Sequence, residues 1–211
     1  MVSQTIRVKF SKNGRLIYIS HLDLCRTMRT ILKRAKLPVK YTEGFNPHLK
    51  MTFALPLSLG VSSDCEFMDL VLCEPMSCEE ASVRLHRAFP PGLSVEALYE
   101  PQTKLTDAAY AAYEITLLGV HWKEALTQKF SAPIFVEKRK KDGTMAEMNL
   151  CDSLASVDFS EIGENTVLYV KIPCANGGSL NPEYVAKVCG AEDYQIRRTH
   201  LYFADGVTDF A

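Results

Sequence analysis

Two histidines and an aspartate are the residues in this sequence best suited to acid–base or metal chemistry. His21 and Asp23 stand two residues apart, and His48 follows within Tyr41–Lys50. Histidine titrates near neutral pH, and a carboxylate can orient it, so such a set suits acid–base catalysis or metal binding. The same residues equally suit capping, packing and the ordering of a loop, or contact with a ligand without catalysis.

A second set of side chains suits the binding of nucleic acid. Cations recur through residues 26–50, with aromatic rings between them. Lys and Arg can follow a phosphate backbone, while aromatic rings and histidine stack on unpaired bases, as in single-stranded RNA recognition. The alternative is a solvated helix face followed by an ordinary loop. The predicted nucleic-acid-binding residues are Arg26, Arg29, Lys33, Arg34, Lys36, Lys40, Tyr41, Phe45, Asn46, His48 and Lys50.

A helix over residues 21–36 is predicted to position the first of these residues. Ser20 is a suitable N-cap, and a carboxylate at Asp23 suits the first turn. Pro38 disfavours helical geometry at the preceding residue and ends the helix. Within it, apolar side chains span an arc of about 120° and cations a neighbouring arc of about 80°. The cations on that arc are Arg26, Arg29, Lys33 and Lys36.

The segment after the helix is predicted to turn back. Gly44 permits a positive φ, and Asn46-Pro47 favours a turn. We therefore expect Phe45 and His48 to lie near the basic helix.

The remaining pattern predicts two similar halves separated by a connector at 100–109. The first half has predicted strands at 5–10, 15–19, 50–57, 66–72 and 93–99, with a turn at 59–63 and a second helix at 78–89. That helix is expected to bury Ala81, Val83, Leu85 and Phe89. The second half has predicted strands at 112–118, 134–138, 166–172 and 194–203, with helices at 122–130 and 182–188. This order predicts an α+β fold of two tandem ferredoxin-like (βαββαβ) modules with antiparallel sheets, over residues 1–100 and 108–211.

Composition places the chain among soluble globular proteins. Of its 211 residues, 47% are hydrophobic and 23% charged, which is typical of that class. No apolar run approaches the roughly 18–20 residues that cross a membrane, and residues 1–10 lack a signal peptide's apolar core. The seven cysteines form no CxxC and no metal-ligand spacing. We expect a cytoplasmic protein with mostly buried, reduced thiols, no metal and no cofactor.

Charge is distributed unevenly along the chain. The net charge is −1, but residues 1–50 hold eleven Lys and Arg against Asp23 and Glu43, a net of +9, which leaves −10 for the remainder. This asymmetry favours a polyanionic partner for the basic end, with no evident DNA specificity. Residues 138–141 (KRKK) form a second basic cluster or a solvated hairpin tip. Arg197 and Arg198 are expected to pair with acids in the second module.

Residues 7–60 resemble the radical SAM-linked protein family, a bacterial domain of unknown function encoded beside or fused to a radical SAM protein. The ending Arg197-Arg198-Thr199 is also similar. The resemblance implies a radical SAM protein as partner, whereas this chain lacks the CxxxCxxC motif of that enzyme. The matching features in residues 7–60 are Ser20-His21-Leu22-Asp23, Arg26, Leu37-Pro38, Gly44-Phe45-Asn46-Pro47-His48 and Pro56-Leu57 with Gly60.

Three functions are compatible with this sequence. The favoured one is a non-catalytic RNA-binding accessory factor for a radical SAM RNA-modifying partner. The second is an RNA-processing or RNA-modifying enzyme that uses His21, Asp23 and His48. The third is a protein-docking module for the radical SAM partner, without RNA.

Overall fold

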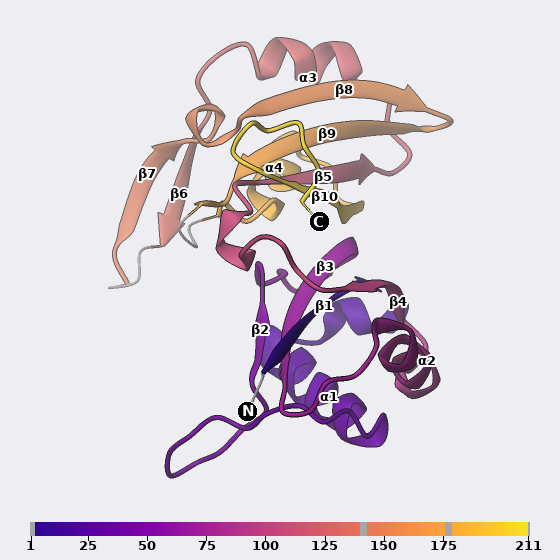
Figure 1. Ribbon diagram of the computed structural model, residues 1–211. Coiled ribbons are helices and arrows are strands. Elements are labelled where there is room, and N and C mark those ends of the chain that lie inside the picture. The colour runs from indigo at the N-terminus through magenta and orange to yellow at the C-terminus, as the bar shows by residue number, and fades with distance from the viewer. Residues whose placement is uncertain (1–2, 140–142, 176–178, 211) are drawn as a thin grey trace. The chain divides into compact units, whose positions relative to one another are not determined.

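The computed structural model describes residues 3–139, 143–175 and 179–210 (Figure 1). The chain folds into two compact units, Met1–Ala108 and Ala109–Phe210. The described residues form a mixed α+β fold with four α-helices. The strand pairs are antiparallel, as the strand and helix order predicts.

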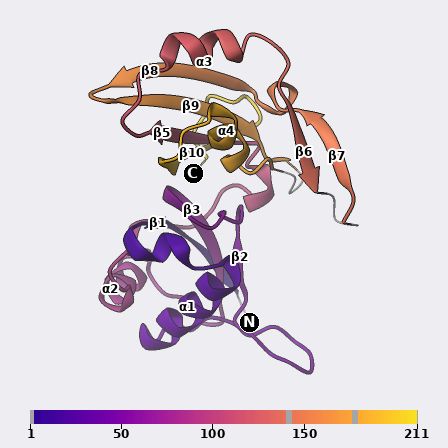
Figure 2. The ribbon, with the colours of Figure 1, turned by 180° about the vertical axis from the view of Figure 1, so that it is seen from behind.

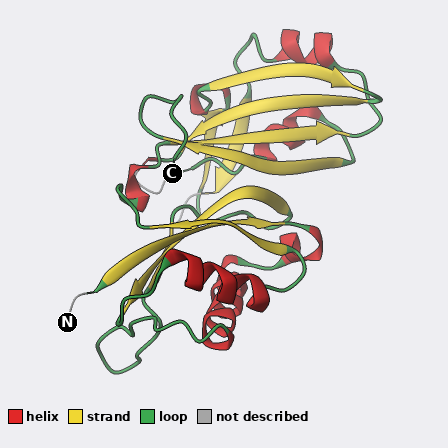
Figure 3. Ribbon diagram, turned by 45° about the vertical axis from the view of Figure 1, so that its right-hand side comes forward, coloured by secondary structure: helices red, strands yellow, loops and turns green. Residues whose placement is uncertain are grey.

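The first unit is a sheet with two helices on one face (Figure 3). Its strands lie in the order β4-β1-β3, and β2 pairs with β3. Ile6, Val8 and Phe10 alternate along the first strand and pack with Met28 and Leu85 from the two helices, as the period-two pattern predicts. The elements are β1 (Gln4–Lys12), α1 (His21–Arg34), β2 (Met51–Phe53), β3 (Val61–Leu72), α2 (Cys78–Ala88) and β4 (Leu93–Tyr99).

Several predictions for this unit are wrong in detail, and of the strand predicted at 50–57 only Met51–Phe53 forms. Residues 15–19 are not extended, because Gly14–Tyr18 winds into a 3-10 helix whose Ile17 carbonyl accepts from the Gly60 N–H at 2.9 Å. The turn predicted at 59–63 is shorter, since β3 already begins at Val61. The Ile17–Gly60 hydrogen bond and the pairing of Ser63 in β3 with Lys12 in β1 both join segments far apart in the sequence, which local patterns do not encode.

Helix α2 begins as predicted but buries a different set of residues. Ser77 caps it by accepting the Glu80 N–H at 3.2 Å. Val83 is exposed and Phe89 is only partly buried, because positions two apart lie about 200° apart on a helix. The buried face follows the i, i+4, i+7 spacing of Ala81, Leu85 and Ala88.

The second unit has strands in the order β10-β5-β9-β8 and a separate hairpin. Arg197 pairs with Glu114 at 3.0 Å across β10 and β5, as predicted. Lys140, Lys141 and the turn expected beside them lie outside the described residues. The elements are β5 (Tyr110–Leu117), α3 (Lys123–Lys129), β6 (Phe135–Arg139), β7 (Met145–Asn149), β8 (Ser156–Ile162), β9 (Asn165–Pro173), α4 (Glu183–Cys189) and β10 (Tyr194–Tyr202).

The cysteines are free thiols in varied environments. Cys73 is exposed, so the expectation of mostly buried thiols holds only in part. Burial raises the pKa of Cys189 to about 11, so this thiol stays protonated at neutral pH. The buried cysteines are Cys65, Cys174 and Cys189, and the half-buried ones are Cys25, Cys78 and Cys151. Among the described residues, no helix is long and apolar enough to cross a membrane.

Candidate nucleic-acid interface

The start of α1 is held by the capping arrangement that its sequence predicts. The Ser20 hydroxyl oxygen accepts the Asp23 N–H at 3.1 Å and donates to the Asp23 carboxylate at 2.7 Å. Arg26 donates to the other carboxylate oxygen at 2.8 Å. The Ser20 hydroxyl first, and Arg26 second, lower the pKa of Asp23 below its ordinary range. The carboxylate thus holds the Ser20 cap, pairs with Arg26 and is a weak base.

Removing the cap should shift this titration. A carboxyl group whose pKa is lowered by folding contributes stability at pH values above its unfolded pKa, and that contribution is lost as the pH falls through the folded pKa. In Ser20→Ala, we expect the Asp23 pKa to rise and the acid-dependent loss of stability at this site to shrink. Carbon-detected NMR titration of the Asp23 carboxyl measures the shift, and an unchanged pKa would contradict the assigned cap.

His21 is held by packing next to this cap. Its ring meets the Phe53 ring edge-on, with centroids 5.2 Å apart, and its Nε2 lies 3.6 Å from the Cys25 sulfur. Burial raises the pKa of Cys25, and the nearby Arg29 charge offsets this only in part. A thiol with a raised pKa is a poor nucleophile at neutral pH, so the His21–Cys25 pair does not resemble an activated nucleophile and its base.

The loop that contains His48 has a stem paired like a β-hairpin. Tyr41 and Leu49 form an antiparallel bridge. The Thr42 N–H donates to the His48 carbonyl at 2.8 Å, and the Lys50 N–H donates to the Lys40 carbonyl at 2.7 Å. Because side chains alternate along a strand, Tyr41 and Leu49 share one face of the stem. The other face carries Lys40, Thr42, His48 and Lys50.

The two faces of this stem have different surroundings. Leu49 is buried in the core that α1 also lines, so His48 points to the opposite side of the ribbon. His48 Nδ1 lies 3.2 Å from the Thr42 hydroxyl and 3.2 Å from the Asn46 carbonyl. Within the described ranges, His48 makes no contact with His21 or Asp23.

The predicted approach of the loop to the helix is therefore not observed. Figures 1 and 2 show the loop after α1 projecting away from the helices rather than folding back over them. The side chains proposed for acid–base chemistry, His21, Asp23 and His48, are not brought together. In the part of the chain that the structure describes, no group of three or more His, Cys, Asp or Glu side chains could hold a metal ion.

The tip of the projecting loop presents an aromatic ring to solvent. Phe45 is fully exposed, and Tyr41 is exposed at the stem. Gly44, with φ of 124°, allows the chain to reverse there. Asn46 and Pro47 follow and are also exposed. A large ring held this far from any core has no packing role in the isolated unit.

Two lysines face each other across the loop stem. Lys40 and Lys50 occupy directly opposite positions, where like charges are unfavourable. Neither ammonium group has a hydrogen bond or ion pair with any described residue. Lys50 is exposed and Lys40 is half-buried. An anion between the two lysines would remove their repulsion.

The cationic side chains of α1 differ in exposure and in pairing, which the sequence does not indicate. Arg26 is paired with Asp23, Arg29 is half-buried, and Lys33 and Arg34 are exposed. Lys36 does not belong to the predicted arc, because α1 ends at Arg34 and Lys36 has a φ of 51°.

The basic N-terminal surface is also smaller than its composition indicates. Arg7 and Lys12 are both buried. Arg7 pairs with Asp69, and Lys12 donates to the carbonyls of Ile17 and Ile19, each at 3.4 Å. The exposed cations around the candidate site are therefore those of the outer face of α1, Lys36 and the loop, and Arg15 is exposed outside both elements.

One cation near α1 was not expected from the sequence. Arg84 of α2 donates to the Lys36 carbonyl at 2.8 Å and to Glu80 at 2.5 Å. It thus caps the end of the first helix from a segment far along the chain. Its spacing four residues after Glu80 signals the ion pair, whereas no local pattern predicts the contact with Lys36.

The family that this chain matches has no assigned activity. A model of the family described as "Uncharacterized protein conserved in bacteria (DUF2344)" matches residues 5–182. A search of curated proteins found no match.

Among the solved structures that match, three cover 93% of the chain at low sequence identity. One comes from "Crystal Structure of a Cbf5-Nop10-Gar1 Complex" (11% identity, TM-score 0.46), of which this chain covers 48%, about half its length. The second is an unknown protein from Galdieria sulphuraria (12% identity, TM-score 0.28, 99% of that chain covered). The third is a putative glycine cleavage system transcriptional repressor (14% identity, TM-score 0.27, 96% of that chain covered).

Proposed function

We propose that this chain, which belongs to the DUF2344 family of uncharacterised bacterial proteins, is a non-catalytic RNA-binding accessory protein. It contacts single-stranded RNA through the projecting loop, residues 40–50, with further phosphate contacts from the outer face of α1. The observation that carries the proposal is a fully exposed Phe45 at the tip of a stem whose two lysines, Lys40 and Lys50, have no partner among the described residues.

The loop combines the two interactions that sequence-tolerant RNA binding needs. An exposed ring stacks on any base, because every base has a π-face, and stacking contributes about 1–3 kcal/mol per base. Lys40 and Lys50 supply positive charge at the foot of the same loop, where a phosphodiester would relieve their repulsion. Tyr41 offers a second exposed ring between the tip and the helix.

The arrangement of the titratable groups argues against the enzyme hypothesis. Asp23 is engaged by Ser20 and Arg26, and His21 packs on Phe53. His48 orders its own loop through Thr42. A general acid and base must both reach the substrate at hydrogen-bond distance, and these three side chains do not share one site.

The partner and the finer fold are also part of this proposal. The resemblance of residues 7–60 to radical SAM-linked proteins supports a radical SAM enzyme to which the bound RNA is presented. The orders β4-β1-β3-β2 and β10-β5-β9-β8 support a ferredoxin-like topology for each unit. Fold alone does not assign function, so the RNA contact rests on the loop.

Salt-dependent binding tests the lysine pair. We expect the wild type to bind a fluorescein-labelled rU oligomer with an affinity that falls as salt rises. In Lys40→Gln/Lys50→Gln, the slope of log K against log salt should shrink by about 1.4, because each phosphate contact on a single strand contributes about 0.7. Fluorescence anisotropy at 50–200 mM NaCl measures both quantities.

A matched variant controls for net charge. Arg15→Gln/Lys123→Gln also removes two exposed cations, one from each unit and neither from the loop, and should keep the wild-type slope. No binding at low salt, or equal slopes for both double variants, would rule out the loop as an RNA contact. Copurification of a radical SAM protein with a wild type that binds no RNA would instead support the protein-docking function.

A further inference from the structure

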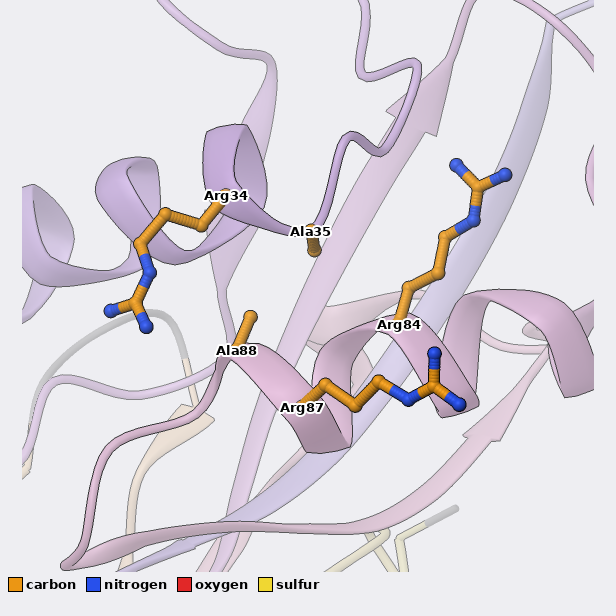
Figure 4. A pocket seen from close by; sticks show the side chains of 5 residues that line it. All are labelled: Arg34, Ala35, Arg84, Arg87 and Ala88. Atoms are coloured by element: carbon orange, nitrogen blue, oxygen red, sulfur yellow. The ribbon is translucent and has the colours of Figure 1, made fainter.

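The helix layer of the first unit contains a small cavity lined by three arginines. It measures about 240 Å³ and lies between the ends of α1 and α2 (Figure 4). Its lining residues are Arg34, Ala35, Arg84, Arg87 and Ala88. We propose that this cavity is a binding site for a phosphate group, separate from the RNA-contacting loop.

The cavity exists because two small side chains meet there. Ala35 follows the last residue of α1, and Ala88 is the last residue of α2; both are nearly buried. Figure 4 shows the Ala35 and Ala88 side chains between the two helix ends, with Arg34 on one side and Arg84 and Arg87 on the other. Larger side chains at either position would fill the space. The volume lies below the roughly 300 Å³ at which pockets for drug-sized ligands begin, so it suits a group of a few atoms.

The charge around the cavity favours an anion. Arg84 is neutralised by Glu80 at 2.5 Å and donates to the Lys36 carbonyl at 2.8 Å. Arg34 and Arg87 have no hydrogen bond or ion pair with any residue in the described ranges. Both helices end here, and each C-terminus contributes about half a negative charge. The three guanidinium groups still leave a net positive charge of about one.

The positions of the guanidinium groups indicate how a ligand would be held. In Figure 4, Arg34 and Arg87 extend in opposite directions from the cavity, and Arg84 points toward the chain that leaves α1. Arg84 is the fixed member because two acceptors hold it. Arg34 and Arg87 are long side chains without partners among the described residues, so they can rotate onto a ligand. Planar guanidinium groups donate paired hydrogen bonds to phosphate oxygens.

The test uses inorganic pyrophosphate as the probe and arginine side-chain NMR as the readout. We expect the Nε–Hε signals of Arg34 and Arg87 to shift saturably, with a Kd of about 1 mM or tighter in dilute buffer. Arg34→Gln/Arg87→Gln should weaken binding at least about tenfold. The control Arg15→Gln, which removes an exposed arginine that does not line the cavity, should bind like the wild type. All titrations are matched in ionic strength with NaCl.

A second probe separates two sources of the phosphate. An rU oligomer without terminal phosphate presents only phosphodiesters, whereas pyrophosphate is a free phosphate ligand. Shifts with pyrophosphate alone assign the cavity to a small phosphate compound, and shifts with both extend it to the RNA backbone. Absence of saturable shifts with pyrophosphate, or undiminished binding by a folded Arg34→Gln/Arg87→Gln protein, overturns the proposal. The loop variant Lys40→Gln/Lys50→Gln should retain pyrophosphate binding, so this result is independent of the proposed RNA contact.

Discussion

Asp69→Ala is expected to lower the free energy of unfolding by about 3–5 kcal/mol, since it leaves a buried guanidinium group without its counter-charge. Arg7 is 0% exposed. Its Nε and one terminal nitrogen donate to the two Asp69 carboxylate oxygens, at 2.7 and 3.0 Å. A loss of this size is a large part of the roughly 5–15 kcal/mol that stabilises a typical domain. Urea denaturation followed by circular dichroism measures it.

Two further variants separate this cause from a general loss of charge. Glu96→Ala removes an exposed carboxylate from β4 of the same sheet, and we expect a change within about 0.5 kcal/mol. Arg7→Met/Asp69→Leu removes both charges, and we expect it to be more stable than Asp69→Ala, because no unpaired ion is then buried. A double variant no better than Asp69→Ala would show that the cost comes from packing.

The buried pair also fixes the segment that follows β4. Arg7 donates to the Thr103 hydroxyl at 3.0 Å and to the Thr103 carbonyl at 2.8 Å. Loss of the Arg7 geometry should therefore loosen residues 100–108 as well as the strand pair. This segment was predicted only as a connector, and its attachment depends on an arginine about a hundred residues earlier.

The features predicted well from the sequence are those decided by neighbouring residues. Ser20 and Ser77 cap their helices as expected, because the accepting hydroxyl and the donating N–H are three residues apart. The alternation of Ile6, Val8 and Phe10 identifies β1 for the same reason. Gly190, with a φ of 85°, ends α4 as predicted.

The features predicted poorly depend on which distant surface a residue meets. The direction of the loop is fixed by Leu49, whose burial against the α1 core turns His48 to the opposite face. Lys12 is buried, so it does not contribute to the basic surface that the charge distribution predicts. Arg84 reaches Lys36 across 48 residues. The charges and aromatic rings of the sequence therefore indicate the candidate segment. They do not predict the direction in which the loop and its side chains point.

Phe45→Ala is expected to weaken binding of an rU oligomer by about 5- to 150-fold, the equivalent of one lost base-stacking contact of about 1–3 kcal/mol. The protein's stability should change by less than about 0.5 kcal/mol, because the ring is fully exposed and contacts no core. Fluorescence anisotropy and urea denaturation on the same samples measure the two effects. An unchanged affinity would remove the aromatic tip from the interface.

Two substitutions at the same position distinguish stacking from apolar docking. Phe45→Trp keeps a π-face and should retain RNA affinity, whereas Phe45→Leu keeps apolar area without a π-face and should behave like Phe45→Ala. If the loop inserts into an apolar pocket of a protein partner, Leu should instead be tolerated, because such pockets discriminate weakly between apolar side chains. The RNA affinities and the partner copurification of the Trp, Leu and Ala variants therefore distinguish the RNA-binding function from the protein-docking one. Because Phe45 is fully exposed, we expect all three variants to keep the fold.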